Sequence, residues 1–247
     1  MPNVIEALQA DRAALLEIGA GLSDAQWSAP SGCPGWSVQD LIAHVGTLFW
    51  QVVDPATLPD AAGRPTEQAQ EVYVAARRAM SATAVLADYE SVSSKALAVL
   101  AAFDGQDFEV PLGDLGTYPA AVLPTAFCFD HYVHIRADLF APRGPLTGPP
   151  PASDALRVGP ALDWIEAALP QQNRELLAPL TGAIDIVITG PGARTIQLGS
   201  GAVVAHVTAD GGAFIRCVTR RSRWDEADAE LQGDERSLQA LRSARVF

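Results

Sequence analysis

Residues 35–50 read GWSVQDLIAHVGTLFW, and this stretch decides the fold. Ser37 is a good N-cap residue, and Asp40 stands three positions after it, which is the capping-box pattern of a helix start. Apolar residues follow at helical spacing, so the stretch predicts a helix from Ser37 to about Val53. His44 lies midway along this helix among apolar neighbours. We therefore expect His44 to face the interior of a helical bundle.

Three further helical stretches surround this one in the first part of the chain. Residues 3–22 are amphipathic, and residues 66–103 form a long stretch that can break in its middle. Residues 119–140, PAAVLPTAFCFDHYVHIRADLF, predict the last helix. Pro124 falls in its first turns, where the missing N–H is tolerated. The pattern predicts a bundle of four helices.

A proline-rich segment, APRGPLTGPPP at 141–151, has the composition of a linker. We therefore expect one domain over 1–145 and a second over 152–247. In the second domain, 153–169 predicts a helix, and IDIVITG, RTIQL and AVVAHVTA predict strands. Helices at about 211–219 and 235–243 close the chain. The expected fold class is α+β multidomain, with a four-helix bundle followed by a small α+β domain.

The composition narrows the class of partner. A net charge of −12 argues against nucleic acid and against anionic membrane surfaces. No apolar run approaches the roughly 18 residues of a membrane span. The three cysteines are far apart in the sequence and form no CxxC pair, which fits a reducing compartment. We expect a cytoplasmic protein whose partner is a small molecule or another protein.

Histidine and aspartate side chains suggest a metal site. In FDHYVH, Asp130 and His134 are four positions apart and share one helix face. His44 on a facing helix can complete a set of three N/O ligands, a way in which helical bundles build metal sites. Three such ligands with an open position fit catalytic Zn²⁺, and the ligand types also suit nickel, iron or manganese.

Other interpretations of these residues stay open. A buried histidine is more often a core residue than a ligand, and a D-xxx-H pair is often an ordinary hydrogen bond within a helix. His131 competes with Asp130, because it lies three positions before His134. His206 falls in a predicted strand, and we interpret it as structural.

Two further side chains are ambiguous. Asp138, four positions after His134, can orient that imidazole or form an exposed ion pair with Arg136 or Arg143. Cys33, in the loop before Trp36, is a reactive thiol or a small buried filler.

The sequence also resembles a known family. CPGWSVQDLIAHV is similar to the Trp-Ser/Thr-Val-x-Asp-[Leu/Val]-x-x-His segment of the mycothiol-dependent maleylpyruvate isomerase N-terminal domain, which belongs to the DinB-like metal-binding four-helix bundles. DHYVH matches the position of the second family motif, Glu-xxx-His. AFIRCVTRRS, near the end of the chain, looks like part of the small α+β domain that often follows.

The resemblance implies specific site residues. The metal ligands carry over as His44, Asp130 and His134, although the family usually has glutamate where this chain has Asp130. A shorter carboxylate at this position must come closer to bind, and His131 can compensate. The family motif Thr-Gly-Arg corresponds to Thr219, Arg220 and Arg221, which makes Arg221 the expected catalytic residue. The alternative for Arg221 is a solvated basic cluster.

The resemblance also implies an activity that uses mycothiol, the low-molecular-weight thiol of actinobacteria. A thiol on the open metal position loses its proton, and the thiolate is the nucleophile. Its addition to a small electrophilic, carboxylate-bearing substrate gives an isomerase or an S-transferase. The alternative is a non-catalytic metal- or ligand-binding or regulatory protein of the same fold. A third possibility is a C-terminal domain that binds an apolar ligand, as sterol-carrier-type domains do.

Overall fold

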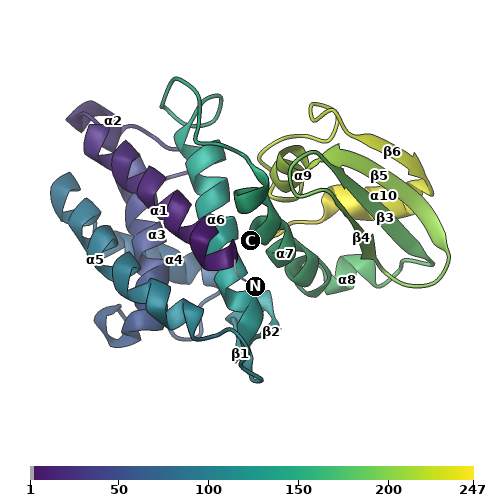
Figure 1. Cartoon of the computed structure of the whole chain (residues 1–247), viewed down its shortest axis with the longest axis horizontal. Helices are drawn as coiled ribbons and strands as arrows, with labels where there is room; N and C mark the ends of the chain where they lie inside the picture. The colour runs from purple at the N-terminus through teal and green to yellow at the C-terminus, as the bar shows by residue number, and fades with distance from the viewer. Residues whose placement is uncertain (1–2) are drawn as a thin grey trace. The chain divides into compact units, whose positions relative to one another are not determined.

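The computed structural model describes residues 3–247, and the chain folds into two compact units. The first unit ends at Ala152 and the second begins at Ser153. Each unit has its own secondary structure, helical in the first and mixed in the second (Figure 1). The expected α+β class, with a helical bundle before a small α+β domain, is confirmed.

Four helices build the bundle of the first unit: α1 (Asn3–Gly21), α3 (Val38–Val53), α5 (Ala82–Ala101) and α6 (Leu123–Val133). The shorter helices α2 (Asp24–Ser28) and α4 (Thr66–Ala75) pack on α3. Helix α1 packs on α5 and α6, and α3 packs on α4, α5 and α6. The apolar stripes of these helices meet in a common core that includes Leu8, Phe49 and Leu100.

The start of α3 follows from its capping residues. The Ser37 hydroxyl accepts a hydrogen bond from the Asp40 amide, and the Asp40 carboxylate accepts one from the Ser37 amide. The predicted capping box is therefore confirmed. The break expected within 66–103 is also found, because α4 ends at Ala75 and Ser81 caps the start of α5.

The last helix of the bundle differs from the prediction at both ends. Residues 119–122 are not α-helical, because Pro119 ends strand β2 (Thr117–Pro119) and a 3₁₀ turn follows. Strand β2 pairs with β1 (Glu109–Pro111) in a short antiparallel hairpin that the sequence did not indicate. After Val133 the chain continues as a π-helix, His134–Leu139. π-Helical turns are rare and often occur at functional sites.

The second unit is a four-stranded sheet with helices. The sheet order is β4-β3-β5-β6; β3 pairs antiparallel with β4 and parallel with β5, and β5 pairs antiparallel with β6. Alternating residues of β3, such as Ile184, Ile186 and Ile188, are buried, and α9 packs on β3, β5 and α7. The elements are α7 (Ala155–Gln172), α8 (Arg174–Leu177), β3 (Ala183–Thr189), β4 (Arg194–Leu198), β5 (Val203–Asp210), α9 (Gly211–Val218), β6 (Glu230–Gly233) and α10 (Glu235–Ser243).

Over residues 3–247, none of the helices is both long and apolar enough to cross a bilayer.

Candidate metal centre

Two helices carry the three candidate ligands. His44 lies in the middle of α3, Asp130 lies on α6, and His134 is the first residue of the π-helix that continues α6. Asp130 and His134 are four positions apart, so their side chains project from one face. Because α3 packs against α6, His44 meets this pair inside the bundle.

One carboxylate oxygen lies close to both imidazoles. Oδ1 of Asp130 is 3.5 Å from Nε2 of His44 and 3.3 Å from Nε2 of His134. A charge-assisted hydrogen bond is shorter, at about 2.7–2.9 Å. Ligand atoms that surround a tetrahedral Zn²⁺ at about 2.1 Å are about 3.4 Å from one another. The observed spacing therefore fits the ligands of one shared cation better than it fits direct hydrogen bonds.

The site is buried and has unused polar atoms. His44 and His134 are 6% and 7% exposed. Within residues 3–247, Nδ1 of His44 and Oδ2 of Asp130 are buried without a hydrogen-bond partner. Buried polar atoms are normally satisfied, so this site is suited to a partner that the chain itself does not supply.

Electrostatics couple the three groups. Burial acts to raise the pKa of the Asp130 carboxyl, but the charges of His134 and His44 outweigh burial and hold this pKa well below its usual range. Burial acts to lower the pKa of His134, but Asp130, then Cys33 and Asp138, raise it well above its ordinary value. The raised pKa of His134 means that a metal ion competes with a proton for this imidazole.

Asp138 binds the other side of the His134 ring. Its Oδ2 lies 2.9 Å from Nδ1 of His134, and its Oδ1 lies 3.3 Å from Nε of Arg143. Both interactions considered from the sequence therefore occur: Asp138 contacts the imidazole of His134 and pairs with Arg143, although its carboxylate is completely buried and not exposed. A proton on Nδ1 leaves Nε2 of His134 to face Asp130 and a metal ion.

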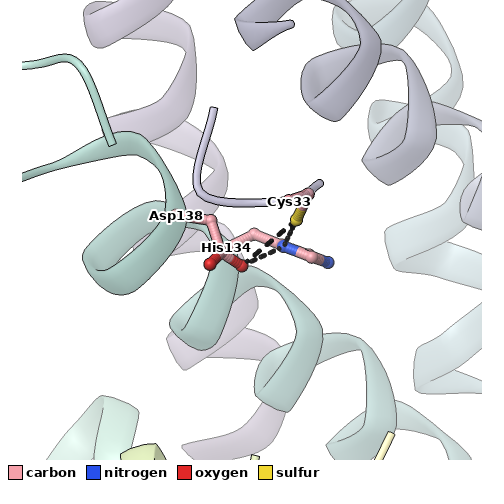
Figure 2. Close-up of side chains that lie close together, drawn as sticks. All are labelled: Cys33, His134 and Asp138. Atoms are coloured by element: carbon pink, nitrogen blue, oxygen red, sulfur yellow. Dashed lines mark hydrogen bonds and ion pairs between the residues drawn. The ribbon is translucent and has the colours of Figure 1, made fainter. Parts of the chain in front are cut away.

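Cys33 lies beside the same nitrogen (Figure 2). Its Sγ is 3.4 Å from Oδ2 of Asp138 and 3.6 Å from Nδ1 of His134. Cys33, His134 and Asp138 thus form a second group whose atoms are close enough to share a cation. Cys33 stands outside the helices, so no helical spacing could have linked it to His134.

His131 does not join the site. It is completely buried, with Nδ1 2.8 Å from the carbonyl of Phe127 and Nε2 3.0 Å from the Tyr89 hydroxyl. The Phe127 carbonyl can only accept a hydrogen bond, so Nδ1 is the donor. Burial lowers the pKa of His131, which favours the neutral ring whose Nε2 accepts from the Tyr89 hydroxyl. The idea that His131 replaces Asp130 or compensates for it is wrong, because His131 faces α5 with both nitrogens engaged.

Trp36 forms one wall of the site, which the sequence did not indicate. Its ring centroid is 4.9 Å from that of His44, and its Nε1 donates to Oε2 of Glu71 at 2.7 Å. Glu71 also binds Arg78, which reaches Asp40. This network ties α4 to the start of α3 and holds the indole over His44.

Arg221 lies in the second unit, in the turn that ends α9. The Arg221 amide binds the carbonyl of Arg216, and the Arg220 amide binds that of Cys217, which together form a Schellman motif. Arg220 occupies its left-handed position with φ of 57°. The role of Arg221 stays a prediction. His206 is exposed on β5, opposite Asp185 of β3.

Comparisons with known proteins link the chain to one family. The family model described as "Mycothiol maleylpyruvate isomerase N-terminal domain" matches residues 8–140, which is more than half of the chain. No curated protein matches the sequence.

Two solved structures share the fold. One is the crystal structure of the mycothiol-dependent maleylpyruvate isomerase, with 13% identity and a TM-score of 0.59. The other is a histidine-to-alanine mutant of that enzyme, with 12% identity and a TM-score of 0.60. Each match covers 92% of this chain and 91% of the other.

Proposed function

We propose that this chain, which belongs to the family of the mycothiol maleylpyruvate isomerase N-terminal domain, is a metal-dependent enzyme that uses mycothiol. The proposed reaction is an isomerisation or S-transfer on a small electrophilic substrate that bears a carboxylate. The observation that carries the proposal is the position of Oδ1 of Asp130, 3.5 and 3.3 Å from the two imidazole nitrogens.

The proposed ligands are His44, Asp130 and His134, and the proposed cation is Zn²⁺. Two imidazole nitrogens and one carboxylate oxygen are a common ligand set for catalytic zinc with an open position. The Asp130 side chain is shorter than the glutamate that is usual in the family. Its Oδ1 nevertheless lies 3.5 Å from Nε2 of His44 and 3.3 Å from Nε2 of His134, which is the spacing expected of ligands to one cation. This geometry supports binding rather than loss of the site.

The residues around the ligands would prepare the site for a thiol. A bound divalent cation supplies a position at which a thiol loses its proton and becomes a nucleophilic thiolate. Asp138 keeps Nε2 of His134 directed at Asp130. The ring of Trp36 lies against that of His44, with the two centroids 4.9 Å apart.

The substrate class follows from thiolate chemistry. A thiolate adds to the electrophilic carbon of a conjugated double bond, and the π bond breaks to give an enolate. Rotation about the resulting single bond and expulsion of the thiolate give an isomer, whereas protonation of the enolate, with the C–S bond retained, gives an S-conjugate. We propose that Arg221 pairs with a carboxylate of the substrate, because a guanidinium binds carboxylates with two parallel hydrogen bonds. Arg221→Lys should then raise KM more than it lowers kcat.

The test compares wild type with His44→Ala and with His206→Ala, a control at an exposed histidine. Elemental analysis should find about one zinc ion per chain in wild type and in His206→Ala, and almost none in His44→Ala. Zinc-loaded wild type with mycothiol and maleylpyruvate should then consume the substrate. Equal, negligible metal in all three proteins would refute the metal-dependent enzyme. Bound metal without turnover would remove maleylpyruvate as the substrate and leave other electrophiles to be tried.

A further inference from the structure

The loop before α3 is hydrogen-bonded to Asp138, the residue that contacts Nδ1 of His134. The Gly32 amide donates to the carbonyl of Asp138 at 2.7 Å, and Nη2 of Arg143 donates to the carbonyl of Gly32 at 2.6 Å. Arg143 also contacts the Asp138 carboxylate through Nε. Backbone and side chain of Asp138 are therefore both held, and the loop brings Cys33 against its Oδ2.

The trio of Cys33, His134 and Asp138 has the composition of a nucleophilic triad but not its geometry. In a triad the imidazole uses one nitrogen for the nucleophile and the other for the carboxylate. Here Cys33 and Asp138 both meet Nδ1, while Nε2 faces Asp130. The thiol is therefore not placed for activation by this histidine.

The same trio is also a poor cation site. Nδ1 of His134 and Oδ2 of Asp138 are 2.9 Å apart, which is a hydrogen-bond distance and is shorter than the spacing of about 3.4 Å between ligands of a tetrahedral zinc ion. Arg143 already pairs with Asp138, so a further cation there would meet a positive charge. The group that includes His44 has the better spacing, and the charges that act on its carboxylate come from the two histidines themselves.

We propose that Cys33 and Asp138 act together as positioning residues for the metal ligand His134. The inference rests on the proposed function, since it takes His44, Asp130 and His134 as the ligands. Oδ2 of Asp138 accepts a hydrogen bond from Nδ1–H of His134, and the Cys33 thiol donates a hydrogen bond to the same oxygen and keeps it in place. The imidazole thereby presents Nε2 at a fixed angle, and carboxylate support makes it a stronger ligand.

The experiment measures Co²⁺ binding and the visible spectrum of the Co²⁺ protein, which reports ligand geometry. The variants are Cys33→Ala, Cys33→Ser and Asp138→Asn, with Cys128→Ala as the control because Cys128 is a buried cysteine of the same unit that contacts Val4. Thermal unfolding of each protein shows that it is folded. Asp138→Asn serves where Cys33→Ala is unstable, because the asparagine keeps the size of the side chain and removes its charge.

The expected results separate positioning from mere packing. Asp138→Asn should weaken Co²⁺ binding roughly tenfold and shift the visible bands, and Cys33→Ala should weaken it severalfold. Cys33→Ser should restore affinity and spectrum, because a hydroxyl also donates to Oδ2, and Cys128→Ala should match wild type.

Three outcomes would overturn the inference. Folded Cys33→Ala and Asp138→Asn proteins that equal wild type in affinity and spectrum would remove the positioning role while leaving the proposed function intact. A thiolate-to-cobalt charge-transfer band in wild type that is lost in Cys33→Ser would make Cys33 itself a ligand. Wild type that binds no Co²⁺ would refute the proposed function, and this inference with it.

Discussion

Replacement of Gly32 by alanine tests how closely the loop before α3 packs against Asp138. A Cβ atom at Gly32 would lie 2.8 Å from Cα of Asp138 and 2.8 Å from its Oδ1. Contacts this short do not occur, and the Cα atom cannot rotate away as the end of a side chain can. Such overpacking costs about 1–3 kcal/mol of unfolding free energy. The backbone shift that relieves it would also move Asp138 away from His134.

The assay for Gly32→Ala is urea unfolding, with Gly21→Ala as the control because a Cβ at Gly21 meets nothing within 4 Å. The midpoint for Gly32→Ala should fall by the stated free energy at unchanged m-value, and Zn²⁺ affinity should fall with it. The control should stay within about 0.5 kcal/mol of wild type. If both variants unfold at the same midpoint, the close approach of this loop to Asp138 is refuted.

Three other perturbations have outcomes that the structure specifies. Asp11→Ala should lower the free energy of unfolding in urea by about 3–5 kcal/mol. The reason is that the buried Arg136 guanidinium loses the carboxylate that lies 2.7 Å from its Nη2. A loss below about 1 kcal/mol would contradict this pairing. Zn²⁺ affinity should fall as pH falls, because the pKa of His134 is raised and its ring must release a proton to bind the ion below that pKa. Calorimetry in buffers of different ionisation enthalpy should detect the released proton. Binding heats that do not depend on the buffer would contradict this prediction. Gly46→Ala should raise the free energy of unfolding by about 0.5–1 kcal/mol, because alanine favours the helix more than glycine does. The added Cβ would lie 3.7 Å from Cα of Tyr89, which is an ordinary contact. A lower Tm in thermal unfolding would show that α3 and α5 are packed more closely than this distance indicates.

Much of the bundle could be predicted because its signals are local. The capping box at Ser37 and Asp40 defines the start of α3 through hydrogen bonds within four residues. The shared face of Asp130 and His134 also follows from helical spacing alone. The position of His44 opposite them depended on one further step, that a polar residue with apolar neighbours faces the core.

The identity of the α6 ligand could not be decided from spacing. α6 is buried on most of its circumference, so its apolar residues do not mark one inner face. Spacing alone therefore leaves His131 as a rival to Asp130 for the position next to His134. Tertiary contacts make the difference, since His131 meets Tyr89 of α5 and Asp130 meets His44 of α3.

The remaining parts of the site depend on contacts between residues far apart in sequence. Cys33 is 101 positions from His134, and Trp36, in the loop before α3, donates a hydrogen bond to Glu71 of α4. The π-helix from His134 has no local signal, because it lacks the proline or glycine that usually marks a helix irregularity. For such features, only the packed structure shows which residues meet.

X-ray absorption at the zinc edge tests the central claim most directly. After loading with one equivalent of Zn²⁺ and dialysis, wild type should retain the ion with a shell of nitrogen and oxygen atoms at about 2.0–2.2 Å, including two imidazoles, and without sulfur. His44→Ala should lose that shell. An ion bound through sulfur, or wild type that retains none, would contradict a metal centre built from His44, Asp130 and His134.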